Sequence, residues 1–323
     1  MTKMKAVCIE SFGGPETLQM MDFEVPQPEA DEVLIKVQAA SVNPVDCKMR
    51  AGRYPPAKME SLPKVLGRDV SGTVVGCGLA VTDFENGDEV YAMLDGGQGG
   101  YAEYVAVRAA LCAPKPRLLS HTEAAAVPLA AITAWQGLFE HGHLNAGQRV
   151  LIHGGAGGVG HFAVQLAKLR GARVATTVTA EDADLMRSLG ANQTVDYESE
   201  RFEDLIHDVD LVFDLVAGDV QERSWAVLKD GGAIVSTIDT PSERYAREHD
   251  ARAVSFVAHP DRDELDVIGQ LIDAGAIRPH VHAIFPLQQA ALAHERLEHQ
   301  HSRGKIVLEV SRKVPNMRTT WAI

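Results

Sequence analysis

A glycine-rich turn in the middle of the chain constrains the fold more than any other feature. Segment 150–170 reads VLIHGGAGGVGHFAVQLAKLR, an apolar run, a G-x-G-x-x-G cluster, and apolar residues at helical spacing. A second apolar run follows at 173–178. Strand, glycine turn, helix and strand in this order predict a dinucleotide-binding turn, because glycine lets backbone N–H groups approach a pyrophosphate at a helix N-terminus. We expect these turn residues to contact a cofactor: Gly155, Gly157, Gly158, Val159 and Gly160.

The pattern of apolar residues changes on either side of this turn. Residues 1–121 hold short alternating apolar runs separated by Gly and Pro, which indicate a compact, mostly β domain. Residues 122–264 alternate longer helical periods with short apolar strands, which is typical of βαβ units around a doubly wound parallel sheet. In residues 265–323 a helix, a strand, a second helix and a final strand near 305–310 predict a return to the first domain.

Length and charge limit the classes of partner. A chain of 323 residues is long for a single core and favours two domains. The formal net charge of −13 opposes binding to nucleic acid or to anionic membranes. We find no apolar run of about 18 residues, and the first ten residues resemble a β-strand rather than a signal peptide. We therefore expect a cytoplasmic protein with no nucleic-acid or membrane partner.

Six ordered motifs show a resemblance to a known family. They are ASVNPVD at 40–46, followed by Arg50, Gly52 and Tyr54; GRDVSG at 67–72; GYAEY at 100–104; TAW at 133–135; the glycine turn; and RGKIV at 303–307. Through them the chain resembles the medium-chain dehydrogenase/reductase superfamily, in its zinc-independent quinone oxidoreductase branch, which includes zeta-crystallin. The resemblance implies a GroES-like β domain, made from both chain ends, around a Rossmann domain, with the active site between them.

The same resemblance implies that no catalytic metal is bound. Asn43 stands where zinc-dependent relatives have a cysteine ligand, and Arg68 stands where they have a histidine. Protonated arginine has no lone pair with which to bind zinc. No cysteine follows Cys112, so the usual third ligand is also missing.

Without a metal, catalysis must rely on orientation and on hydrogen bonds to the atom that gains negative charge. Such a site suits acceptors that are already electrophilic, such as quinones and conjugated enones. Asn43 and Tyr54 are the candidate catalytic residues, because their side chains could hydrogen-bond a substrate oxygen or an ordered water. The alternative readings are an Asn that stabilises the turn before Pro44 and a Tyr that packs in the loop before Pro55.

Further candidate cofactor contacts lie outside the glycine turn. The resemblance places Thr133 by the nicotinamide, although a helical threonine that bonds its own backbone has the same sequence signature. Val216 and Ser236 lie near the carboxyl ends of predicted strands, where open parallel sheets bind ligands. Arg303 and Lys305, in the returning segment, could reach a cofactor phosphate or ribose.

The end of the second Rossmann strand predicts that NADPH is preferred over NADH, with NADH still possible. NAD-selective domains end this strand with an acidic residue that would repel a 2′-phosphate, whereas this chain has Val178. Thr177 or Thr179 could donate a hydroxyl to the phosphate, and the resemblance adds Tyr197 and Arg303 as neighbours. Two acidic residues oppose this preference unless they point to water, Glu181 and Asp182.

Together these features predict a zinc-independent NADPH-dependent oxidoreductase that transfers a hydride to a small electrophilic substrate, a quinone or a conjugated enone. Two alternatives stay open: reduction of another activated alkene, such as an alkenal or enoyl thioester, and a non-catalytic NAD(P)H sensor or structural protein. The resemblance also implies a homodimer joined through the edges of the Rossmann sheets. The apolar run 254–258 is the candidate edge strand, because an exposed apolar edge is unstable unless it is covered.

Overall fold

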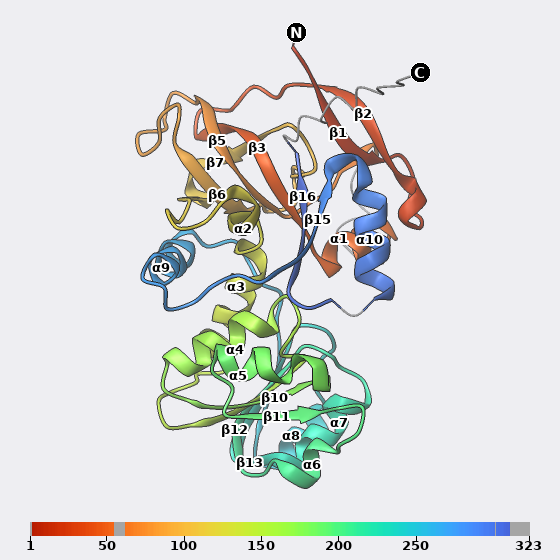
Figure 1. The fold of residues 1–323 in the computed structure, drawn as a ribbon, viewed down its shortest axis with the longest axis vertical. Helices are drawn as coiled ribbons and strands as arrows, with labels where there is room; N and C mark the ends of the chain where they lie inside the picture. The colour runs from red at the N-terminus through yellow and green to blue at the C-terminus, as the bar shows by residue number, and fades with distance from the viewer. Residues whose placement is uncertain (1, 55–61, 301, 311–323) are drawn as a thin grey trace, which may run out of the picture.

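The computed structural model describes residues 2–54, 62–300 and 302–310 and has two parts, one above the other in Figure 1. The lower part contains a parallel sheet with strand order β11-β10-β9-β12-β13-β14. Numbered from β9 this order is 3-2-1-4-5-6, that of the doubly wound Rossmann fold. The strands are β9 (Arg149–His153), β10 (Arg173–Val178), β11 (Gln193–Asp196), β12 (Val209–Asp214), β13 (Leu228–Ser236) and β14 (Arg252–Ser255).

Helices cover both faces of this sheet. On one face α4 packs against β9, β10 and α3, and in Figure 1 α4 and α5 lie above the strands, whereas α6, α7 and α8 lie lower in the picture. Their apolar sides form two separate buried clusters, one on each face. The helices are α3 (Pro128–Trp135), α4 (Gly160–Leu169), α5 (Ala183–Leu189), α6 (Phe202–Leu205), α7 (Asp219–Ser224) and α8 (Glu243–Glu248).

The upper part is mostly β structure. Its larger sheet has the order β15-β16-β3-β5-β6-β8, with β7 also paired to β3, and a smaller sheet has the order β2-β1-β4. The strands are β1 (Lys3–Ile9), β2 (Leu18–Glu24), β3 (Glu32–Val42), β4 (Lys64–Val65), β5 (Asp69–Cys77), β6 (Glu89–Met93), β7 (Tyr104–Arg108), β8 (Cys112–Pro114), β15 (Val281–Pro286) and β16 (Lys305–Glu309). The predicted fold class is confirmed: a Rossmann parallel sheet joined to a mostly β domain that both ends of the chain build.

Four helices connect or flank the upper part: α1 (Pro44–Arg50), α2 (His121–Ala125), α9 (Arg262–Asp273) and α10 (Ala290–His299). Helix α2 packs on β3 and β5, whereas α3 packs on α4, so the chain passes from one part to the other between these two helices. Helix α9 contacts both β8 and α3. None of the helices in the described ranges is long and apolar enough to cross a membrane.

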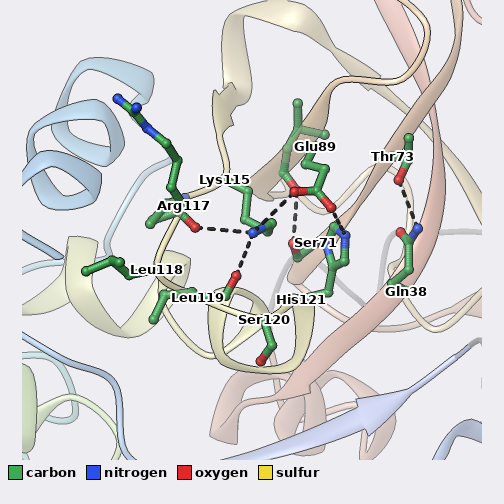
Figure 2. A network of polar contacts seen from close by, with 12 residues as sticks. Gln38, Ser71, Thr73, Glu89, Lys115, Arg117, Leu118, Leu119, Ser120 and His121 are labelled. Carbon is green, nitrogen blue, oxygen red and sulfur yellow. Dashed lines mark hydrogen bonds and ion pairs between the residues drawn. The ribbon is translucent and has the colours of Figure 1, made fainter. Parts of the chain in front are cut away.

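A polar network fastens α2 to the upper sheet, as Figure 2 shows. His121 places Nδ1 2.8 Å from Ser71 Oγ and Nε2 3.1 Å from Glu89 Oε1. Lys115, whose side chain is buried, lies 3.4 Å from Glu89 Oε2 and donates to the Leu119 carbonyl at 2.5 Å. The network fixes the segment that leads from the β domain into the Rossmann domain.

The predicted edge strand 254–258 is displaced in the structure. Strand β14 does end the sheet, but it covers Arg252–Ser255. The backbone N–H of Phe256 donates to the Ser236 carbonyl, and the chain then turns toward Gln136, which bonds the backbone of His259. The apolar run thus divides into the end of a strand and an irregular segment in which Phe256 is buried and Val257 is exposed.

Candidate active site

A cavity of about 720 Å³ lies between the two parts and takes its walls from both. The β domain contributes residues that follow β3 and precede β5, and the Rossmann domain contributes the glycine turn and the carboxyl ends of its strands. The returning segment before β16 closes a third side. Of the predicted site residues, these line the cavity: Asn43, Tyr54, Thr133, Gly157, Gly158, Val159, Gly160, Thr177, Tyr197, Val216 and Lys305.

The glycines of the turn have different physical roles. A Cβ atom at Gly155 would lie 2.0 Å from Thr176 Oγ1, and one at Gly160 would lie 2.2 Å from the Gly154 carbonyl oxygen. Both positions are needed for close packing of the turn on its strand and helix, and Gly155 does not line the cavity. At Gly157 a Cβ would have only one atom within 4 Å, at 3.3 Å, so this glycine borders open space. The turn therefore leaves room for a pyrophosphate at the helix N-terminus.

A buried histidine, which the sequence analysis did not identify, lies beneath the glycine turn and is linked to it by hydrogen bonds. His153, at the end of β9, has Nδ1 3.1 Å from Thr177 Oγ1 and Nε2 2.9 Å from Ser224 Oγ. Ser224 donates its own proton to the Val220 carbonyl, so it accepts from Nε2–H, and Nδ1 accepts from Thr177. Burial lowers the pKa of His153, which keeps the ring neutral.

This chain of hydrogen bonds changes the role expected of Thr177. Its hydroxyl donates to His153 and accepts from the Gly154 N–H at 3.2 Å. The predicted donation from Thr177 to a cofactor phosphate does not fit, because its only proton is used within the protein. The signal in the sequence was His153, a polar residue that directly follows the apolar run 150–152 of this strand.

Two other residues predicted to meet the 2′-phosphate are held by a buried carboxylate. Thr179 Oγ1 donates to Asp182 Oδ2 at 3.2 Å, and Arg303 Nε forms an ion pair with Asp182 Oδ1. Neither Thr179 nor Arg303 lines the cavity. Asp182 thus points into the protein rather than to water, and Arg303 balances its charge. Tyr197 lines the cavity and is half exposed.

The remaining predicted cofactor contacts of the Rossmann domain fall into two groups. Some line the cavity, and others hold the loops that line it. The Thr133 hydroxyl donates to the Leu129 carbonyl at 2.6 Å, which is the alternative reading, although the residue also lines the cavity. Ser236 does not line the cavity and donates to Asp214 Oδ2 at 3.2 Å. Buried Asp214 also accepts the Val216 N–H at 3.0 Å, so it shapes the loop that forms this wall.

On the β-domain side, Asn43 belongs to a buried polar cluster. Its Nδ2 donates to Asp69 Oδ2 at 2.9 Å, and its Oδ1 accepts from Lys305 Nζ. Its backbone N–H donates to Asp46 Oδ2 at 2.8 Å, which closes the start of α1. Asp69 is also bound by Ser41 Oγ at 2.6 Å. The Asn43 amide is therefore fixed in orientation, and no local sequence pattern marks Asp69 as its partner.

A second set of buried ionisable groups lies behind this cluster. Tyr101 Oη donates to Asp46 Oδ2 at 3.3 Å and lies 3.1 Å from His294 Nε2. Nη1 of the buried Arg50 lies 3.2 Å from His294 Nδ1, and Arg50 Nη2 donates to Glu298 at 2.8 Å. Burial and the nearby Asp69 raise the pKa of Asp46 to about 7, and burial lowers the pKa of His294 to about 3. These contacts join α1 to α10.

Arg68 stands where zinc-dependent relatives have a histidine ligand. It lines the cavity and donates from Nε to the Leu94 carbonyl at 2.7 Å. Within the described ranges, no group of three or more His, Cys, Asp or Glu side chains is arranged to hold a metal ion.

Comparison with known proteins agrees with this architecture. Residues 29–117 match the family described as alcohol dehydrogenase GroES-like domain, and residues 189–308 match the family described as zinc-binding dehydrogenase. The chain is 39% identical over 318 residues to the chloroplastic NADPH-dependent alkenal/one oxidoreductase of Arabidopsis thaliana, across 95% of this chain and 79% of that protein.

Solved structures give the same result. The quinone oxidoreductase from Coxiella burnetii superposes with a TM-score of 0.90 at 38% identity, covering 96% of this chain and all of the other. The Escherichia coli quinone oxidoreductase complexed with NADPH superposes with a TM-score of 0.86 at 29% identity, covering 95% and 100%. On its fold, its motifs and these relatives, the chain belongs to the medium-chain dehydrogenase/reductase superfamily, in the quinone oxidoreductase branch.

Proposed function

We propose that this protein is an NADPH-dependent reductase that transfers a hydride to a quinone or a conjugated enone without a catalytic metal. One observation carries the proposal: the glycine turn and the residues Asn43 and Tyr54 line the same cavity, so cofactor and acceptor can meet there. Relatives named as an NADPH-dependent alkenal/one oxidoreductase and as a quinone oxidoreductase bound to NADPH support it.

The Rossmann wall fits NADPH. The open side of Gly157 and the adjoining backbone N–H groups accommodate the pyrophosphate, and Tyr197 is available to the adenosine ribose. When bound, the cofactor supplies the hydride. We assign cofactor contact to the residues on this wall: Thr133, Gly157, Gly158, Val159, Gly160, Tyr197 and Val216. Thr177 lines the cavity with its hydroxyl bonded to His153, and Gly155, Thr179, Ser236 and Arg303 support the wall from behind it.

The opposite wall binds and orients the acceptor. Tyr54 offers a hydroxyl that can donate to the substrate oxygen, and Asn43 fixes the geometry of its surroundings through Asp69 and Lys305. Metal independence rests on the side chains at the two positions where relatives bind zinc. Asn43 is an amide held in hydrogen bonds, and Arg68 is bonded to the Leu94 carbonyl.

Steady-state NADPH oxidation against a panel of quinones, enones, alkenals and enoyl thioesters tests the function, with NADPH affinity measured in parallel. We expect turnover with quinones or enones that survives exhaustive chelation. Tight NADPH binding without turnover of any acceptor would instead identify a sensor or structural protein. Loss of activity on removal of one stoichiometric zinc would overturn the proposed mechanism.

We also propose a cytoplasmic homodimer with no nucleic-acid partner. Among residues 2–54, 62–300 and 302–310 no strand pairs with the outer edge of β14, and Val257 beside it is 74% exposed. A second copy would cover this edge and its apolar side chains. Light scattering that finds only a 34.9 kDa species at micromolar concentration would contradict the dimer.

A further inference from the structure

Lys305 reaches the β-domain wall of the cavity through the register of three strands. β16 pairs antiparallel with β3, with Ile306 opposite Val42, so Lys305 comes to lie beside Asn43. β3 also pairs with β5, where Ser41 lies opposite Asp69. The side chain crosses the glycine turn, since a Cβ at Gly158 would lie 3.1 Å from Lys305 Cδ.

The Lys305 ammonium is buried and only partly neutralised. The residue is 3% exposed, Nζ donates to Asn43 Oδ1, and Nζ lies 3.6 Å from Asp69 Oδ2. Burial lowers its pKa, and the nearby carboxylates of Asp69 and Asp46 counter that shift. An ammonium has three protons, and these two acceptors on described residues leave one for a ligand. Lys305 itself lines the cavity.

The reaction of the proposed function produces negative charge at this place. Hydride addition to the β-carbon of an enone moves the alkene electron pair toward the carbonyl oxygen, which becomes an enolate. A fixed cation in a site that excludes water stabilises such a charge strongly. A cofactor phosphate, by contrast, would bind the backbone N–H groups of the glycine turn, which the Lys305 side chain passes at Cδ, whereas its Nζ is held at Asn43 and Asp69 on the β-domain wall.

Building on the proposed function, we propose that Lys305 is a catalytic residue that binds the acceptor oxygen and protonates it after hydride transfer, rather than a phosphate ligand. One N–H bond of Nζ breaks and an O–H bond forms, which gives an enol that tautomerises to the saturated ketone. The neutral amine then takes a proton from solvent. In sum, enone, NADPH and one proton give the saturated ketone and NADP⁺.

The test compares Lys305→Met with wild type on two acceptors at saturating NADPH. Single-turnover hydride transfer to an enone should fall by about 10²- to 10³-fold, the usual effect of losing one oxyanion donor. With an ortho-quinone the loss should be less than about tenfold, because the hydroquinone anion is a weaker base and needs less stabilisation. The Kd for NADPH should change by less than about threefold, since no phosphate contact is lost.

A readout without turnover uses 4-nitrophenol as a mimic of the enolate, its ionisation followed by absorbance. Wild type, with or without NADP⁺, should bind the ionised form at least about tenfold more tightly than the neutral form, as expected for a charge-assisted hydrogen bond. Lys305→Met should lose this preference. The double variant Lys305→Met/Asp69→Asn repeats both measurements without leaving Asp69 unpaired, in case the single variant does not fold.

Lys115→Met is the matched control, because Lys115 is a similarly buried lysine of the same domain and does not line the cavity (Figure 2). It should leave the acceptor dependence and nitrophenolate binding unchanged. Equal losses on both acceptors, unchanged rates, or a loss confined to NADPH affinity would each overturn the role of Lys305. Wild-type protein that reduces neither acceptor would instead refute the proposed function, and with it this role.

Discussion

The two walls of the cavity differ in the chemical groups that they present to charged ligands. The Rossmann wall offers the glycines and backbone N–H groups of its turn, and the polar His153 beneath them is buried and bonded within the protein. The β-domain wall instead contains buried ionisable side chains, among them Asp69 and Lys305, close to Asp46.

This difference predicts two kinds of sensitivity. A wall made of backbone depends on shape, so added atoms should harm it more than lost charges. A wall made of buried charges depends on their balance, so removing one partner without changing its size should be costly.

Asp69→Asn should have the largest effect on stability. The carboxylate accepts from the Leu129 N–H through Oδ1 and from Ser41 and Asn43 through Oδ2, which also pairs with Lys305. An amide keeps only one acceptor oxygen and no charge, so it cannot satisfy all of these partners. We expect a loss of about 3–5 kcal/mol in the free energy of unfolding, typical of a buried charge left without its partner. Urea denaturation measures it, and adding Lys305→Met should recover part of the loss. A loss below about 1 kcal/mol would show that this wall is not balanced by charge.

The pH dependence of the free energy of unfolding should reveal the raised pKa of Asp46. Its pKa is raised from the usual 3.8 to about 7, so the folded state binds the proton more tightly than the unfolded state does. The stabilisation is complete below pH 3.8 and is lost as the pH rises through about 7. Relative to Asp46→Asn, which does not titrate, wild type should lose about 2 kcal/mol of unfolding free energy between about pH 5 and pH 7. Parallel curves for the two proteins would contradict the raised pKa.

On the other wall, Gly160→Ala should act through shape. The new Cβ would lie 2.2 Å from a backbone oxygen that cannot move without shifting the turn. We expect a loss of about 1–3 kcal/mol in unfolding free energy, together with weaker NADPH binding. Gly157→Ala is the matched variant, because its nearest atom would be 3.3 Å away. It should weaken NADPH binding with little change in thermal stability, and equal destabilisation by both would refute the distinction.

The same contrast explains how far the sequence was informative. The Rossmann turn, its flanking strands and the β-domain pattern were predictable because local periodicity and glycine spacing determine them. The Asn43–Lys305 contact joins residues 262 positions apart, and only the pairing of β16 with β3 brings them together. Motif reasoning identified both residues but assigned them to different tasks, a substrate contact and a cofactor contact.

The candidate phosphate contacts of the Rossmann domain illustrate a different difficulty. Thr177, Thr179 and Arg303 were chosen for their donor groups, but a sequence does not show which donors are already satisfied. In the structure, Thr177 donates its hydroxyl proton to His153, and Thr179 and Arg303 are bonded to Asp182. The signal for His153 was its position directly after the apolar run 150–152, and nothing local marked Asp182 as buried.

The smallest effect we expect is a change in cofactor preference at Val178. This side chain ends β10, is buried and lines the cavity, so Val178→Asp would place a carboxylate where NAD-selective domains have one. The carboxylate would accept hydrogen bonds from ribose hydroxyls and repel a 2′-phosphate. The ratio of kcat/KM for NADPH to that for NADH should fall by about tenfold, equivalent to about 1.4 kcal/mol.

Val178→Asn separates charge from size in this test, because its amide has nearly the same shape but cannot repel a phosphate by charge. If the shape of the wall alone selects the cofactor, both variants should change the ratio equally. If the absence of an acidic residue selects NADPH, only Val178→Asp should move the ratio toward NADH. Asp182 does not interfere, since it is buried and paired with Arg303. Steady-state kinetics with both cofactors decides between these outcomes, and a wild-type ratio at or below one would refute the preference itself.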